Sequence, residues 1–88
     1  MDRARSITDG LQTNVARNVA ALMARGELDQ MQLAALSLVA QKAISNVVNG
    51  RNGCRIDILA AIAYALGVAP SLLLMPPEML PTGIRNLD

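Results

Sequence analysis

Apolar residues recur along most of this chain at intervals of three and four, the spacing that places them on one face of an α-helix. Gly26, Gly50 and Gly67 each follow such a stretch, and a glycine can end a helix by adopting a positive φ. The sequence therefore predicts five short helices. Their expected ranges are 12–25, 30–37, 41–49, 57–66 and a short stretch from about residue 70, where proline is tolerated in a first turn.

The expected helices direct their apolar faces toward a common core. These faces consist of Val15, Val19, Leu22 and Met23 in the first helix and Ile58, Leu59, Ile62 and Leu66 in the fourth. Asp29 is placed to cap the second helix. Residues that favour strands are sparse and do not alternate with polar ones, so the fold class is predicted to be all-α.

The chain has 88 residues, enough for one domain with a single core. We expect that domain to span residues 12–74. Residues 1–11 show no apolar stripe and are expected to form a flexible N-terminal arm, whose Arg3 and Arg5 either follow a nucleic-acid backbone or are simply solvated. Residues 75–88 hold three of the four prolines and are expected to lie extended over the surface or to pack back on the core.

The composition excludes several classes of chemistry. Histidine is absent and Cys54 is the only cysteine, so the chain has no internal disulfide and no cluster with zinc-ligand spacing. A phosphate-binding loop and suitably spaced paired carboxylates are also absent. We therefore expect no catalytic residue, no metal and no cofactor. The chain shows neither a signal peptide nor an uninterrupted apolar run of about 18 residues, which favours a soluble cytoplasmic protein.

Charge is unevenly distributed, although the formal net charge is only +1. No acidic residue lies between Asp29 and Asp57, whereas Lys42, Arg51 and Arg55 fall inside this interval. One side of the domain is therefore expected to be locally positive.

The range 41–49 separates polar from apolar side chains most clearly. An angular projection places Gln41, Lys42, Ser45, Asn46 and Asn49 on one arc and Ala43, Ile44, Val47 and Val48 on the other. Every member of the polar arc can form hydrogen bonds and none is acidic. Amides pair with adenine and lysine reaches guanine, so this face suits base edges in a DNA major groove. The alternative interpretation is an ordinary solvated helix face, although such faces usually mix lysine with glutamate.

The segment from Leu28 to Gly50, LDQMQLAALSLVAQKAISNVVNG, resembles the helix-turn-helix of Cro and lambda-repressor-like proteins. The matching positions are Gln30, Leu33, Ala34, Val39, Ile44, Ser45, Asn49 and Gly50. Downstream, ILAAIAYALGV at 58–68 resembles the fourth helix of that family, and 72–74 fit the fifth. The resemblance covers about residues 12–74. It implies a compact five-helix DNA-binding domain whose helix-turn-helix is formed by the second and third helices.

The family resemblance also implies roles for individual residues. Base contacts would come from Gln41, Lys42, Ser45 and Asn46. Phosphate contacts would come from Gln30, Asn49, Arg51, Asn52 and Arg55, with Gln30 also bracing Gln41. Phosphate contacts fix the orientation of a protein on DNA, whereas base contacts determine the sequence that it reads.

This sequence departs from the family pattern at three positions. Leu38 stands where the family commonly has glycine in the turn, and Ala40 replaces the usual serine or threonine cap of the recognition helix. Cys54 stands where proline is frequent. A non-glycine residue in a left-handed turn costs roughly 1–2 kcal/mol, and a missing cap costs about 1 kcal/mol.

The leading hypothesis is a transcriptional regulator of phage or prophage repressor type that binds double-stranded DNA as a homodimer. The expected dimer contacts at Leu72, Leu73 and Met75 follow from the C-terminal part, which offers more apolar surface than a short helix easily buries. Tyr64 is added because it projects away from the apolar stripe of the fourth helix, where it either touches a partner subunit or lies flat with a solvated hydroxyl. An alternative is that this apolar part folds back on its own core. The competing function is an antitoxin-like interaction module, whose apolar C-terminal segment holds a protein partner while the DNA-binding part represses its own operon.

Overall fold

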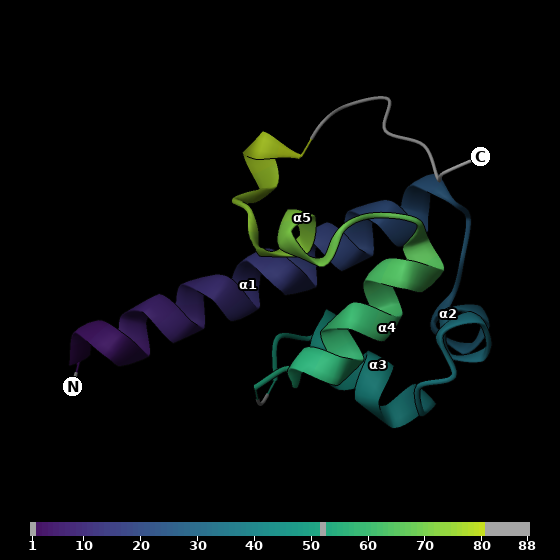
Figure 1. The fold of residues 1–88 in the computed structure, drawn as a ribbon, viewed down its shortest axis with the longest axis horizontal. Coiled ribbons are helices and arrows are strands. Elements are labelled where there is room, and N and C mark those ends of the chain that lie inside the picture. The colour runs from purple at the N-terminus through teal and green to yellow at the C-terminus, as the bar shows by residue number, and fades with distance from the viewer. Residues whose placement is uncertain (1, 52, 81–88) are drawn as a thin grey trace.

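Five α-helices and one short 3-10 helix make up the part of the chain that the computed structural model describes, residues 2–51 and 53–80. In chain order the elements are α1 (Asp2–Arg25), α2 (Gln30–Ser37), α3 (Gln41–Val48), α4 (Ile56–Leu66), α5 (Pro70–Leu74) and η1 (Pro77–Met79). No strand occurs in these residues, so the predicted all-α class is confirmed. Helix α1 packs against α5, η1 and α3, while α4 packs against α2 and α5 (Figure 1).

The predicted boundaries of the helices after residue 25 hold to within one residue. Asp29 caps α2 as expected, because its Oδ1 accepts from the Gln32 N–H at 2.7 Å while Gln32 Oε1 accepts from the Asp29 N–H at 2.8 Å. Gly50 and Gly67 adopt the positive φ values of 68° and 75° that end helices. At the end of α1 the expectation is wrong in detail, since Glu27 rather than Gly26 takes the positive φ.

The predicted flexible arm over residues 1–11 is wrong for every residue of that range that the structure describes. Helix α1 begins at Asp2, ten residues earlier than expected, and its 24 residues rise about 36 Å along the 41 Å long axis of the molecule. Once the later turns are packed, each further residue adds a hydrogen bond without a new nucleation cost. The Thr8 and Thr13 hydroxyls also donate to the carbonyls four residues earlier, both at 3.0 Å.

The core lies between α1 and the four helices that follow it. The predicted faces are confirmed at Val15, Val19, Leu22, Met23, Leu59, Ile62 and Leu66, which are buried, while Ile58 is half-buried. Leu33 and Ile44 are fully buried from α2 and α3. Each fully buried aliphatic side chain contributes about 1.5–3 kcal/mol of transfer free energy, so this cluster fixes the position of α3 against α1.

Two asparagines of α1 hold the C-terminal end of α5. Asn18 is fully buried, and its Nδ2 donates to the carbonyls of Leu72, Leu73 and Met75 at 3.3, 3.0 and 2.8 Å. Asn14 Nδ2 donates to the Leu74 carbonyl at 3.0 Å. The last carbonyls of a helix have no partner within the helix, and here α1 supplies the donors.

The expected dimer contact at Leu73 is wrong, because this side chain is fully buried in the chain's own core. The C-terminal part folds back as far as residue 80. The backbone does not stay extended after Met75, since η1 follows and Leu80 is buried with only 7% of its surface exposed. Residues 81–88, the rest of the predicted tail, lie outside the described residues.

Candidate functional site

Helices α2 and α3 are joined by three residues, Leu38 to Ala40, and their axes are bent by 119°. Leu38 makes the turn with φ 59° and ψ 28°, the left-handed conformation that a glycine would adopt without strain. The Val39 N–H donates to Ser37 Oγ at 3.3 Å. The half-buried Val39 side chain packs on the core. The turn has no glycine, and it is held instead by the packing of Val39 and by one local hydrogen bond.

The two predicted faces of α3 separate at five of the nine positions 41–49, while the other four are half-buried whichever face they were assigned to. Ile44 and Val47 are buried at 0% and 8% exposure, and Ala43 and Val48 are half-buried. On the polar side Gln41, Lys42 and Asn49 are exposed, whereas Ser45 and Asn46 are half-buried. The exposed part of the polar face therefore lies at the two ends of the helix. Ala40 provides no side-chain hydrogen bond at the N-terminal end, as its apolar side chain predicts.

The C-terminal end of α3 is held in a defined position. Asn49 Nδ2 donates to Ser45 Oγ at 3.3 Å, and the Arg51 N–H donates to the Asn46 carbonyl at 2.8 Å. A Cβ added at Gly50 would lie 3.8 Å from the Cβ of Ala16, so this turn lies beside α1. The exposed residues Asn49 and Arg51 therefore lie on either side of Gly50 in this turn.

The cationic side chains near α3 are all exposed, and one of them forms an ion pair with an acidic side chain. Lys42 and Arg51 are exposed. Arg55 Nη2 lies 3.0 Å from Asp57 Oδ2, and both of these side chains are mostly exposed. An exposed ion pair of this kind adds little stability, but it offsets the charge that Arg55 offers to an anion. Gln30 is half-buried at the start of α2. Asn52, also expected at this site, lies outside the described residues.

The remaining expected dimer contacts differ in their exposure. Tyr64 projects from α4 with 85% of its surface exposed. Leu72 and Met75 are half-buried beside α1. Tyr64 is the most accessible of these three side chains, and a dimer contact through them stays a prediction.

Cys54 is half-buried in the connection between α3 and α4. Burial, together with the negative charge of Asp57, raises the pKa of its thiol above the ordinary value of 9.0. The thiol therefore stays protonated at neutral pH, which disfavours nucleophilic chemistry. Among the described residues, no group of three or more Cys, Asp or Glu side chains is placed to hold a metal ion.

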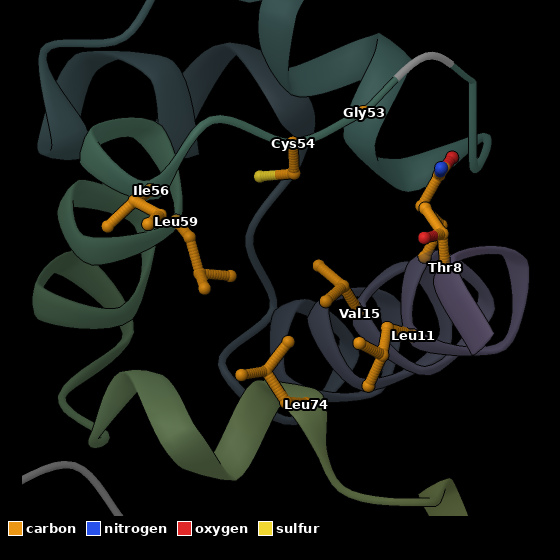
Figure 2. Close-up of a pocket in the computed structure, with 9 residues that line it drawn as sticks. Thr8, Leu11, Val15, Gly53, Cys54, Ile56, Leu59 and Leu74 are labelled. Carbon is orange, nitrogen blue, oxygen red and sulfur yellow. The ribbon is translucent and has the colours of Figure 1, made fainter. Parts of the chain in front are cut away.

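Sequence reasoning missed an apolar groove beside the first half of α1. It has a volume of about 250 Å³. Figure 2 shows the side chains of Leu11, Val15, Leu59 and Leu74 directed toward one common space, with the Cys54 connection above it. The expectation that residues 1–11 show no apolar stripe overlooked Ile7 and Leu11, which continue the helical spacing of Val15 and were the signal in the sequence.

In the described part of the chain no single helix is long and apolar enough to cross a membrane, and only the bent pair α2 and α3 meets that test of length and composition when taken together. No family model matches the sequence, and the comparisons with curated proteins and with solved structures gave no match.

Proposed function

We propose that the chain is a sequence-specific double-stranded DNA-binding transcriptional regulator, of phage or prophage repressor type, that reads the major groove with α3. The observation that carries this proposal is the outer edge of α3, whose exposed side chains Gln41, Lys42 and Asn49 are able to form hydrogen bonds and include no acid. The lambda-repressor-like helix-turn-helix architecture is part of the proposal.

The geometry of α2 and α3 supports this function. Helix-turn-helix pairs cross at about 90–120° with a turn of three or four residues, and the 119° bend with its three-residue turn fits that range. The eight residues of α3 form a rod about 12 Å long, and the major groove is about 12 Å wide. A helix of this size can enter the groove while its apolar side stays on the core.

The exposure of the polar side chains suggests an order of roles. Recognition helices contact base edges mainly with their N-terminal residues. Gln41 and Lys42 hold that position and are exposed, so they would dominate base reading. Ser45 and Asn46 are half-buried and would make contacts only where the groove floor approaches the helix closely.

Phosphate contacts would flank the base-reading edge. Gln30 lies at the start of α2 and would reach a phosphate with its side-chain amide, because the Asp29 carboxylate already accepts from the Gln32 N–H at this helix end. Asn49 and Arg51 would contact phosphates of the DNA backbone beyond the C-terminal end of α3. Arg55 would contribute less than Arg51, because Asp57 already pairs with it at 3.0 Å.

The antitoxin-like alternative depended on an apolar C-terminal segment that holds a protein partner. Leu73 and Leu80 are instead buried against the chain's own helices. This burial leaves less apolar surface for a partner, so DNA binding is the better supported of the two functions.

The test is selection of bound duplexes from a random pool, followed by fluorescence anisotropy titration of the selected duplex and a scrambled one. Gln41→Ala should reduce the preference for the selected duplex by about 5- to 150-fold, since one good bidentate base contact gives about 1–3 kcal/mol of discrimination. Ser71→Ala, an exposed polar residue in the first turn of α5, is the matched control and should retain the parent's preference. Equal binding of the parent to both duplexes would refute the proposed function.

A further inference from the structure

The apolar groove is bordered on four sides by different parts of the chain. Helix α1 forms one wall and the start of α4 the opposite wall, while the end of α5 and the connection between α3 and α4 close the two ends (Figure 2). Val15 and Leu59 in its lining are buried, whereas Leu11, Ile56 and Leu74 are exposed. The groove therefore combines a buried apolar bottom with an apolar rim.

The closed ends favour a small molecule over a protein segment as the occupant. A docked helix or strand needs a trough that is open at both ends, since its anchor side chains follow one another along several residues. Here Leu74 stands at one end of the groove and Cys54 at the other (Figure 2). The occupant must fit between these two residues.

The volume of the groove sets the size of the occupant. The groove measures about 250 Å³. An apolar cavity of about 150 Å³ holds one benzene molecule, so at the same volume per atom this groove holds about ten non-hydrogen atoms.

The lining sets the chemical class of the occupant. Most of the lining is aliphatic, and none of its side chains is an acid or a base of the Asp, Glu, Lys or Arg kind. A charged group would lose its water there without gaining a partner. Gln12 on the α1 wall is half-buried, and its side-chain amide has no hydrogen-bond partner among residues 2–51 and 53–80. This amide can both donate and accept, so it suits one neutral polar group.

We propose that the apolar groove binds a small neutral molecule with an aliphatic body and one hydroxyl or carbonyl group, which forms a hydrogen bond with the Gln12 amide. The body covers apolar surface that Leu11, Ile56 and Leu74 leave exposed, and this burial supplies most of the affinity. Because the ligand is small and one side of the groove stays open, the dissociation constant should be about 0.1–1 mM.

The groove is also placed to influence the DNA contacts proposed for α3. A small hollow beside the groove is lined by Val47, Gly50 and Arg51, and it shares Gln12 and Cys54 with the groove. A ligand that binds this arrangement stabilises it relative to other arrangements of the connection. We therefore expect the ligand to raise DNA affinity. This regulatory role rests on the proposed function, whereas ligand binding itself is a property of the free protein.

The probe is 1-octanol, a neutral aliphatic alcohol close to the expected size. It is titrated into the isotope-labelled full chain without DNA, and amide shifts are followed by NMR. The shifts should saturate and should be largest at Leu11, Gln12, Cys54 and Leu74. Gln12→Ala should weaken binding by about 2- to 12-fold, the value of one net hydrogen bond.

A pair of tryptophan variants tests the location of the site. Leu11→Trp should weaken 1-octanol binding by about tenfold or more, because the indole ring occupies the space between the walls. Ile7→Trp is the matched control, since Ile7 lies one turn earlier on α1, is exposed and does not line the groove. It should bind 1-octanol like the parent, and circular dichroism should show equal helix content in all variants.

The regulatory role is tested by anisotropy titration of the selected duplex with and without near-saturating 1-octanol. The affinity of the parent should rise by about fivefold or more, at the lower end of typical coupling between two sites. The affinity of Leu11→Trp should not change. An unchanged affinity of the parent would overturn the regulatory role.

Three results would overturn the binding site itself. The first is a lack of saturable shifts up to the solubility of the alcohol, and the second is a Leu11→Trp variant that binds like the parent. The third is equal shifts at exposed apolar residues outside the groove, such as Met31 and Leu36, which would show unspecific adsorption. Failure here is distinguishable from failure of the proposed function, because the preference of the parent for the selected duplex is measured without 1-octanol.

Discussion

Replacing Asn18 with alanine should destabilise the protein strongly, because this one side chain joins α1 to the end of α5. Its amide donates to three carbonyls at 2.8 to 3.3 Å inside the core, while its own Oδ1 is buried without a partner. Leaving buried acceptors unpaired costs about 1–3 kcal/mol each, and removing the unpaired Oδ1 returns about 1 kcal/mol. An amide has two hydrogens, so two bonds carry most of the effect, and the net loss is about 1–5 kcal/mol, with a central expectation of about 3 kcal/mol.

The measurement is urea and thermal unfolding followed by circular dichroism. A domain of this size is expected to have a total free energy of unfolding of about 4–13 kcal/mol, and the Tm of Asn18→Ala should fall by about 10–20 °C. Asn14→Ala is the matched control, since Asn14 makes one bond at 3.0 Å from a half-buried position, and it should lose about 1 kcal/mol or less. If the two variants unfold within 0.5 kcal/mol of each other, roughly the error of such a comparison, the reasoning about α5 is refuted.

Three other predictions concern DNA affinity, the turn and the thiol. Arg51→Ala should flatten the slope of log DNA affinity against log salt concentration by about one unit. Arg55→Ala should flatten the same slope less, because Asp57 already offsets the charge of Arg55. Fluorescence anisotropy at several salt concentrations measures both slopes. Leu38→Gly should raise the free energy of unfolding by up to about 1 kcal/mol in urea, since it removes left-handed strain at a side chain that is 92% exposed, whereas Leu38→Ala keeps the strain and should show no gain. Because the pKa of the Cys54 thiol is raised in the folded protein, the unfolded chain loses this proton at a lower pH than the folded one. The free energy of unfolding should therefore fall as the pH rises from 9.0 through the folded pKa. Urea titrations at each pH should show that Cys54→Ala lacks this contribution to the fall.

Periodicity and glycine placement were sufficient to predict α2, α3 and α4 because each combines an apolar face with a local stop signal. Gly67 and the Asp29 capping box are signals of this kind, and both act within a few residues. The division of α3 into an inner and an outer face was also available from the sequence, since it follows from the helical repeat alone.

The start of α1 and the fate of the C-terminal part depended on contacts between distant residues. Residues 7–10, Ile-Thr-Asp-Gly, have weak helix propensity, so their helical state depends on continuity with packed turns farther along. Burial of Leu73 and Leu80 depends on α1 offering Asn14 and Asn18 to the α5 carbonyls about 55 to 60 residues away. No pattern within α5 itself carries that information.

The most direct test of the central claim is an NMR titration of the isotope-labelled chain with the selected duplex. If α3 reads the major groove, the largest amide shifts should occur at Gln41, Lys42 and Arg51, with little change at the groove residues Leu59 and Leu74. Shifts that are confined to the groove, or that spare α3 while the duplex is bound, would contradict the account.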